Sequence, residues 1–180
     1  MHQRVWVIGA SSGIGEACAR ELLKRGAKLV LSSRRIERLE DIARSADTTQ
    51  SLVIPVDVMD QSSITRAYQT IHTQWGGVDL LLFVSGIYIP LRADDFNMGD
   101  AQKTVDSNIL GPMRAVATVL PDMLRAGHGH LHRNQRARPP HCAAPAVFRV
   151  VGGGLPQRPP AARPGHPAGP ERQRRPPAPD

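Results

Sequence analysis

Four short runs of consecutive apolar residues, each followed by a segment of helical spacing, constrain the fold of this chain most. The runs are residues 5–8, 29–31, 52–54 and 80–84. Short runs that are apolar at every position are typical of strands buried on both faces of a sheet. Strands that alternate with helices predict a parallel sheet with right-handed crossovers. We therefore expect an α/β protein with a doubly wound parallel sheet, a Rossmann fold truncated after about four strands.

Helical spacing occurs between and after these runs. Apolar residues recur every three or four positions over 64–75 and, more briefly, over 36–42. A longer helix should follow the fourth strand. Its apolar stripe comprises Val105, Ile109, Met113, Val116, Leu120 and Leu124. With the expected strand order 3-2-1-4, the fourth strand would be an open edge that favours aggregation, and the long helix would lack a packing partner.

The composition changes abruptly at about residue 130. Residues 131–180 contain 12 Pro, 9 Arg, 8 Ala and 5 Gly. Proline at this density excludes ordinary helices and inner strands. We divide the chain into a Rossmann domain over 1–130 and a disordered Pro/Arg-rich tail over 131–180. At most a short ordered piece is expected around 147–151.

The positive charge of the chain lies in the same tail. Residues 1–130 contain 14 basic and 14 acidic residues, whereas the nine arginines of the tail face only Glu171 and Asp180, so the tail carries the whole net charge of +7. Nucleic-acid binding by this tail is a minor alternative function, and we expect no such partner because Phe148 is its only aromatic residue. The sequence has no run of eighteen apolar residues and no signal-peptide pattern, which predicts a cytoplasmic protein without a membrane partner.

A glycine-rich turn follows the first apolar run and precedes a helix. Glycines let the backbone turn sharply and approach a pyrophosphate, whose charge faces the positive end of the helix. The alternative is an ordinary turn capped by Ser11 or Ser12. The position of the glycine-rich turn between a strand and a helix favours a dinucleotide site. The residues expected to form it are Gly9, Ser11, Ser12, Gly13, Ile14 and Gly15.

The end of the second strand discriminates between two dinucleotides. NAD would need an acidic residue here, but the sequence reads Ser33-Arg34-Arg35. Arg34 can bind a 2′-phosphate through charge-assisted hydrogen bonds worth about 1.5–3 kcal/mol. We therefore expect NADP (NADPH) as the cofactor. Arg35 is equally well explained as a solvated residue of the following helix.

Together these features resemble the short-chain dehydrogenase/reductase (SDR) family over residues 5–129. Gly9, Gly13 and Gly15 match the family's Gly-x-x-x-Gly-x-Gly turn. Further motifs resemble the family's Asp-Val pair, its Asn-Asn-Ala-Gly motif (here without both asparagines), its mid-helix Asn-x-x-Gly and the closing turn of that helix. They are Asp57-Val58, Phe83-Val84-Ser85-Gly86, Asn108-Ile109-Leu110-Gly111 and Pro121-Asp122-Met123.

The resemblance implies roles for these residues. Asp57 and Val58 would receive the adenine, Ser85 and Gly86 would permit close approach of the cofactor, and Asn108 would take part in a proton relay. The implied function is that of an NADP-dependent oxidoreductase, which transfers hydride between the nicotinamide cofactor and a small alcohol or carbonyl substrate. A homo-oligomer is compatible with it.

Three catalytic residue types of the family are missing where they are expected. The family uses a Ser, and a Tyr with a Lys four residues later, to bind and protonate the substrate oxygen. Residues 131–180 contain no Ser, Tyr or Lys, so Asn108 is the only surviving catalytic position. The alternative function is therefore a catalytically inactive nucleotide-binding fragment.

Histidines gather near residue 130. We nevertheless expect no metal site, because alternation with glycine and flexible flanks provide no rigid scaffold. The residues concerned are His128, His130, His132, His141 and Cys142.

We hypothesise that the tail arises from a change of reading frame near His130, with an evolved extension as the alternative. GC-rich DNA read out of frame yields mainly Pro, Arg, Ala and Gly, which make up 34 of the 50 tail residues. We expect one of the other two frames of the gene to encode a Ser upstream of Tyr-x-x-x-Lys. The hypothesis fails if neither frame does.

Overall fold

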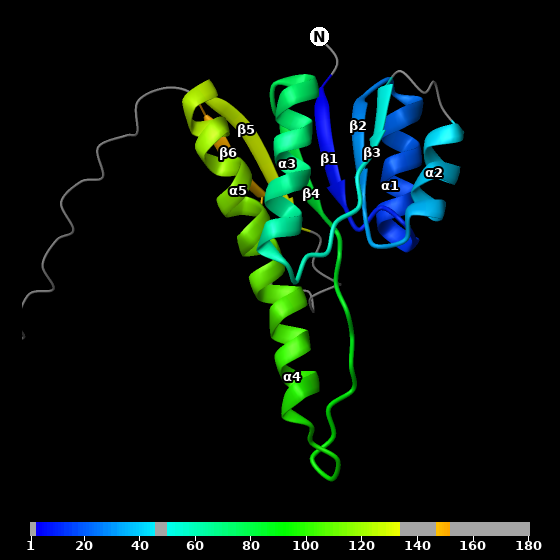
Figure 1. The fold of residues 1–180 in the computed structure, drawn as a ribbon, viewed down its shortest axis with the longest axis vertical. Coiled ribbons are helices and arrows are strands. Elements are labelled where there is room, and N and C mark those ends of the chain that lie inside the picture. Colours follow the sequence, from blue (N-terminus) through cyan, green and yellow to red (C-terminus); the bar gives the residue numbers. More distant parts are fainter. Residues whose placement is uncertain (1–2, 46–49, 134–146, 152–180) are drawn as a thin grey trace, which may run out of the picture.

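The computed structural model describes residues 3–45, 50–133 and the strand 147–151 (Figure 1). The elements are, in chain order, β1 (Arg4–Ile8), α1 (Gly13–Lys24), β2 (Lys28–Ser32), α2 (Ile36–Arg44), β3 (Ser51–Val53), α3 (Gln61–Trp75), β4 (Leu80–Phe83), α4 (Met98–Val105), the π-helical turn η2 (Asp106–Leu110), α5 (Gly111–Ala126), β5 (His128–Arg133) and β6 (Val147–Val151).

The sheet confirms the predicted fold class and extends it. Its strand order is β3-β2-β1-β4-β5-β6, with β1 to β5 parallel and β6 antiparallel to β5. The expected order of the first four strands is therefore correct. The expectation that β4 forms an open edge is wrong, because β5 pairs with it from Leu80↔His130 to Phe83↔Arg133.

The sequence pattern missed β5 because the strand has no apolar run. It reads His-Gly-His-Leu-His-Arg, and backbone pairing on both of its edges holds it in the sheet. The boundary predicted at residue 130 falls inside β5, and the short ordered piece expected around 147–151 corresponds to β6. Residues 134–146 and 152–180, the remainder of the predicted tail, lie outside the described residues.

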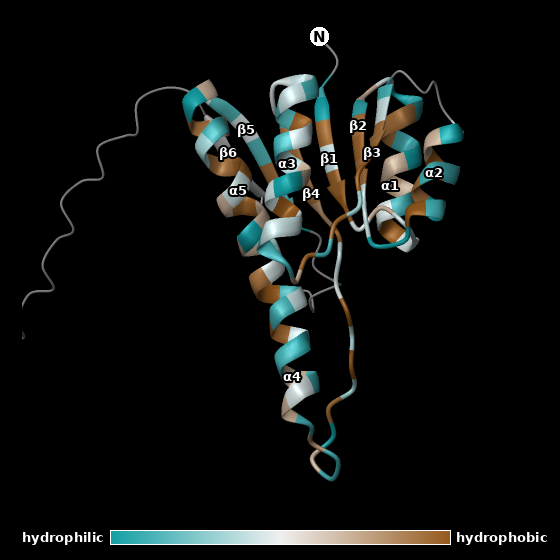
Figure 2. Ribbon diagram, in the orientation of Figure 1, coloured by the Kyte–Doolittle hydropathy of each residue, from teal (hydrophilic) through white to brown (hydrophobic). Residues whose placement is uncertain are grey.

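Two apolar layers cover the two faces of the sheet. Leu39 and Ile42 of α2 and Ala19 and Leu23 of α1 pack on one face, while α3 and α5 pack on the other. Figure 2 shows hydrophobic residues concentrated in the strands and hydrophilic ones on the outward sides of the helices. This is the two-sided burial that the continuous apolar runs predict.

A polar chain links the sheet to α3 and α5 through the buried layer. Trp6 Nε1 donates a hydrogen bond of 2.9 Å to Ser32 Oγ, and its ring stacks on Tyr68 at a centroid distance of 6.0 Å. The Tyr68 hydroxyl donates to Asp122 Oδ2 at 2.8 Å. Burial, reinforced by Asp122, raises the pKa of Tyr68 above its usual range. Tyr68 is therefore a neutral structural residue.

The long helix after β4 consists of α4, η2 and α5. Pro121-Asp122-Met123, interpreted as its closing turn, lies inside α5, which continues to Ala126. α5 packs through Ala115, Val119 and Met123. α4 buries none of its residues and projects away from the sheet (Figure 1).

Four of the six residues of the predicted apolar stripe are exposed, whereas Val116 and Leu120 pack on the layer that α3 and α5 share. The expected lack of a packing partner is therefore wrong for α5. Ile109 is 50% and Met113 62% exposed, and Val105 and Leu124 are exposed too. None of the described helices is long and apolar enough to span a membrane.

An ion pair joins the beginnings of β1 and β4. Arg4 Nη2 lies 2.6 Å from Asp79 Oδ1, and Asp79 Oδ2 accepts from the Arg4 backbone N–H at 2.8 Å. Partial burial opposes ionisation of Asp79, but the hydrogen bonds from the Arg4 side chain and backbone outweigh it and hold its pKa below the usual value.

This lowered pKa predicts a pH dependence of stability. Because the folded pKa lies below the unfolded value of about 3.9, the contribution is fully present above about pH 5 and is lost as the pH falls through the folded pKa. At pH 7 we expect Asp79→Asn to lower the free energy of unfolding by roughly 1 kcal/mol, since the pair is partly exposed. Urea unfolding between pH 7 and pH 2.5 measures the free energy of unfolding of the wild type and of Asp79→Asn. If the difference between the two does not shrink as the pH falls, the lowered pKa of Asp79 is contradicted.

Candidate cofactor-binding site

The glycine-rich turn is anchored where β1, β2 and β4 end. The N–H of Gly9 donates to the Ser32 carbonyl at 2.7 Å, and the N–H of Ala10 donates to the same oxygen at 3.2 Å. Gly9 has a φ of +97°, and a Cβ on it would lie 2.5 Å from the Ser85 nitrogen. A side chain here would collide with the backbone that follows β4, so this position requires glycine.

The helix start beyond the turn is open. A Cβ on Gly15 would lie 2.1 Å from the Gly9 carbonyl oxygen, whereas a Cβ on Gly13 would meet no atom within 4 Å. Ser12 is the N-cap of α1, yet its side chain makes no capping hydrogen bond. The capping hydrogen bond that the alternative of a serine-capped turn requires of Ser12 is therefore not formed. The first amides of α1 lack intrahelical acceptors and, with the helix dipole, suit an anion.

Arg35 lies against this turn. Its backbone N–H donates to Ser33 Oγ at 3.0 Å, which fixes the local turn between β2 and α2. Its guanidinium Nη2 donates to Ser11 Oγ at 3.1 Å and to Ser12 Oγ at 2.9 Å. Arg35 is exposed, as a solvated residue would be, and its guanidinium also contacts the turn. Ser33 was the feature of the sequence that indicated this local turn, because a serine hydroxyl can accept a hydrogen bond from the backbone N–H two residues later.

Arg34 points to a different part of the same edge. It lines a hollow of about 430 Å³ together with Asp57 and Arg66. The Asp57 N–H donates to Ser63 Oγ at 3.0 Å, and Asp57 Oδ1 accepts from the Met59 N–H at 2.9 Å. The structure thus brings Arg34 and Asp57 to the lining of one hollow.

Asn108 lies on η2 and holds the segment after β4. Its Oδ1 accepts from the Ile87 N–H at 2.9 Å, and its Nδ2 donates to the Ile87 carbonyl at 2.8 Å. A Cβ on Gly86 would lie 3.1 Å from Asn108 Oδ1. The Asn108 carbonyl accepts a hydrogen bond from the Arg133 guanidinium at the end of β5. The π-helical turn, a feature frequent at functional sites, thus fixes the backbone beside Gly86.

The two tyrosines differ in their surroundings. Tyr68 joins α3 to α5, as described above, and Tyr88 is 76% exposed. Neither hydroxyl is hydrogen-bonded to Asn108 or to the glycine-rich turn in the part of the chain that the structure describes.

The histidine-rich segment has a firmer scaffold than the sequence predicted. His128, His130 and His132 belong to β5, which pairs with neighbouring strands. The argument that no rigid element presents histidines is therefore wrong for these three. His141 and Cys142 lie outside the described residues.

The residues at the carboxyl ends of β1, β2 and β4 fit a dinucleotide. The surrounding backbone leaves no room for a side chain at Gly9 or Gly15, while the space over Gly13 is open. Arg35 supplies a cation at the turn. Ligands of open α/β sheets bind at this edge, where the strand order reverses beside β1.

Comparisons with known proteins agree with this geometry. The sequence model of the short chain dehydrogenase family matches residues 3–131. An uncharacterized oxidoreductase from Staphylococcus aureus (strain MW2) is 33% identical over 125 residues, which cover 69% of this chain and 54% of the relative. One from Staphylococcus epidermidis (strain ATCC 35984) is also 33% identical, with the same coverage.

Solved structures show the same relation. A short-chain dehydrogenase from Streptomyces avermitilis superposes with a TM-score of 0.70 at 25% identity, over 74% of this chain and 49% of the other. An alcohol dehydrogenase from Thermococcus sibiricus, complexed with 5-hydroxy-NADP, gives 0.70 at 26% identity, over 77% and 62%. The chain spans about half the length of the curated relatives it matches. By sequence and by fold, the chain belongs to the short-chain dehydrogenase family.

Proposed function

We propose that this chain binds NADP(H) as the cofactor-binding part of an oxidoreductase that transfers hydride between the nicotinamide and an alcohol or carbonyl substrate. The observation that carries the proposal is the guanidinium of Arg35, held on the glycine-rich turn by the hydroxyls of Ser11 and Ser12. The family membership supports the reaction class, and the Thermococcus sibiricus structure, which contains 5-hydroxy-NADP, supports the cofactor class.

The charges around the turn favour a 2′-phosphate over a free ribose diol. β2 is followed by Ser33, Arg34 and Arg35 in place of an acid that could accept from two hydroxyls. Arg35 forms no ion pair with the described acidic residues. Its remaining donors, the two serine hydroxyls and Arg34 together provide cationic and polar groups for a phosphate dianion.

Each of the other site residues would bind a different part of the cofactor. The amides at Gly13, Ile14 and Gly15 would hold the diphosphate. Asp57 and Val58 would receive the adenine, whose amino group can donate to the Asp57 carboxylate. Ser85 and Gly86 would allow close approach of the nicotinamide half, which supplies the hydride when the cofactor is bound.

Asn108 acts in this proposal as a positioning residue. Both ends of its amide bind the Ile87 backbone, so the side chain orders the segment beside Gly86. An amide so engaged cannot replace the acid that a hydride transfer to a carbonyl needs.

A catalytically inactive NADP-binding chain is the second candidate. It is favoured by the lack of Ser, Tyr and Lys beyond Ser107, Tyr88 and Lys103 in the sequence, and by the structural role of Tyr68. Cofactor binding and catalysis come from different parts of the chain, so the first can be present without the second.

The cofactor choice predicts the effect of replacing the two arginines. Arg35→Ala and Arg34→Ala should each weaken NADPH binding by about tenfold or more, the loss of a charge-assisted hydrogen bond, and should change NADH binding little. Arg38→Ala is the matched control, because Arg38 is an exposed arginine of α2 that pairs with Glu16 at 3.3 Å. Titration followed by nucleotide fluorescence measures all affinities. Equal losses for NADPH and NADH would count against the 2′-phosphate assignment.

A turnover assay separates the two candidates. We expect this chain to bind NADPH without oxidising it when a panel of aldehydes and ketones is added, because residues 131–180 contain no Ser, Tyr or Lys. Loss of NADPH absorbance with time is the measurement, and a catalytically competent family member is the positive control. Turnover above the buffer rate would refute the inactive candidate and support the complete enzyme activity.

A further inference from the structure

β5 places three histidines on one face of the sheet. Side chains of a strand alternate between its faces, so His128, His130 and His132 share one face and Leu131 lies on the other. Leu131 is buried in the apolar layer that α3 and α5 cover. The three imidazoles therefore belong to the opposite face, the one that carries α1 and α2.

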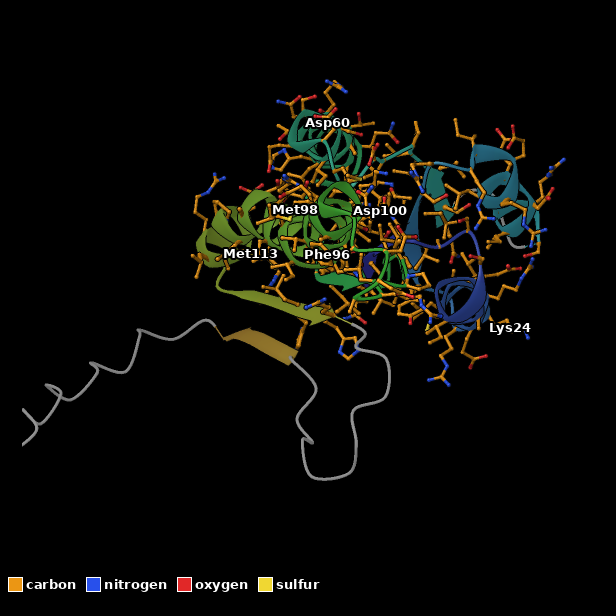
Figure 3. All side chains as sticks on the ribbon, turned by 90° about the horizontal axis from the view of Figure 1, so that it is seen from below. Lys24, Asp60, Phe96, Met98, Asp100 and Met113 are labelled. Atoms are coloured by element: carbon orange, nitrogen blue, oxygen red, sulfur yellow. The ribbon has the colours of Figure 1, made fainter. Side chains whose placement is uncertain are left out.

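That face is only partly covered near β5. In register, Leu80 lies beside His130 and Leu82 beside His132, and both leucines join the layer packed under α1 and α2. α1 and α2 pack mainly on β1, β2 and β3, whereas α5 packs on the far side of β5 (Figure 3). His130 and His132 are accordingly half-buried beside leucines and remain accessible from solvent.

We propose that His130 and His132 form a binding site for a divalent transition-metal ion. Alternate residues of a strand lie about 6.6 Å apart on the same face, so two imidazoles can converge on one ion at metal–nitrogen distances of about 2.0–2.1 Å. Neutral imidazole suits Zn²⁺, Cu²⁺ and Ni²⁺, while Mg²⁺ prefers oxygen ligands. The described residues include no group of three or more His, Cys, Asp or Glu suited to one ion, so water completes the coordination.

The backbone selects this pair over His128 and His130. His130 and His132 are paired with β4 on one side and with β6 on the other. The His130 N–H also donates to the Asp79 carbonyl at 2.9 Å. His128 is exposed and precedes the residues paired with β4. Two fixed and half-buried side chains lose less conformational freedom on binding than a pair that includes an exposed one.

Isothermal titration of the full chain with NiCl₂, ZnCl₂ and CuCl₂ tests the site. We expect His130→Asn and His132→Asn each to weaken metal binding by at least about tenfold. Replacing a residue that only hydrogen-bonds to a metal ligand already lowers metal affinity by about tenfold or more. His128→Asn and His72→Asn are matched controls, the first from the same strand and the second from α3, and should leave the affinity unchanged. MgCl₂ should give no binding heat, and Cu²⁺ should bind more tightly than Ni²⁺ or Zn²⁺.

Two readouts keep the test independent of folding defects and of nucleotide binding. Circular dichroism identifies variants that fold, and the electron paramagnetic resonance spectrum of the Cu²⁺ complex should show coupling to two imidazole nitrogens that His130→Asn/His132→Asn removes. Wild-type affinity in this folded double variant, or an equal loss in His128→Asn, would overturn the proposal. NADPH affinity should be the same in the double variant, so failure of the metal site and failure of the cofactor site are distinguishable.

Discussion

The close approach of the Gly9 backbone to the ends of β2 and β4 is the constraint on which the site depends. Two amides of the turn share the Ser32 carbonyl, and the Gly9 α-carbon faces the Ser85 nitrogen at a distance that excludes a Cβ. This contact aims the start of α1 at the edge of the sheet. No side chain caps α1 at Ser12, and the first amides of a helix suit an anion.

The rest of the domain keeps that edge in place. The contacts from Ser32 through Trp6 and Tyr68 to Asp122 tie the end of β2 to α3 and α5. Asn108 ties η2, in the middle of the long helix, to the segment beyond β4. These interactions involve residues of β1 to α5. The residues proposed to hold the cofactor thus lie within the part of the chain that matches the family.

β5 shows how backbone pairing can override composition. Its single apolar side chain, Leu131, packs in the layer under α5. Backbone hydrogen bonds along both edges supply the rest of the stabilisation of the strand. The same pairing arranges histidines that the sequence shows only as an alternating series. A strand in a sheet fixes their common face and spacing, and these are the two properties that a pair of metal ligands requires.

The amino-acid sequence by itself determined the Rossmann architecture and the glycine-rich turn, because continuous apolar runs, helical spacing and glycines act through local and short-range physics. It also determined that Ser, Tyr and Lys are missing beyond residue 130. Only the tertiary structure decided that β5 covers β4, that Arg35 rather than Arg34 touches Ser11 and Ser12, and that the stripe at Ile109 and Met113 is exposed. Each of these depends on contacts between segments far apart in the chain, for which a pattern of residue types carries no direct signal.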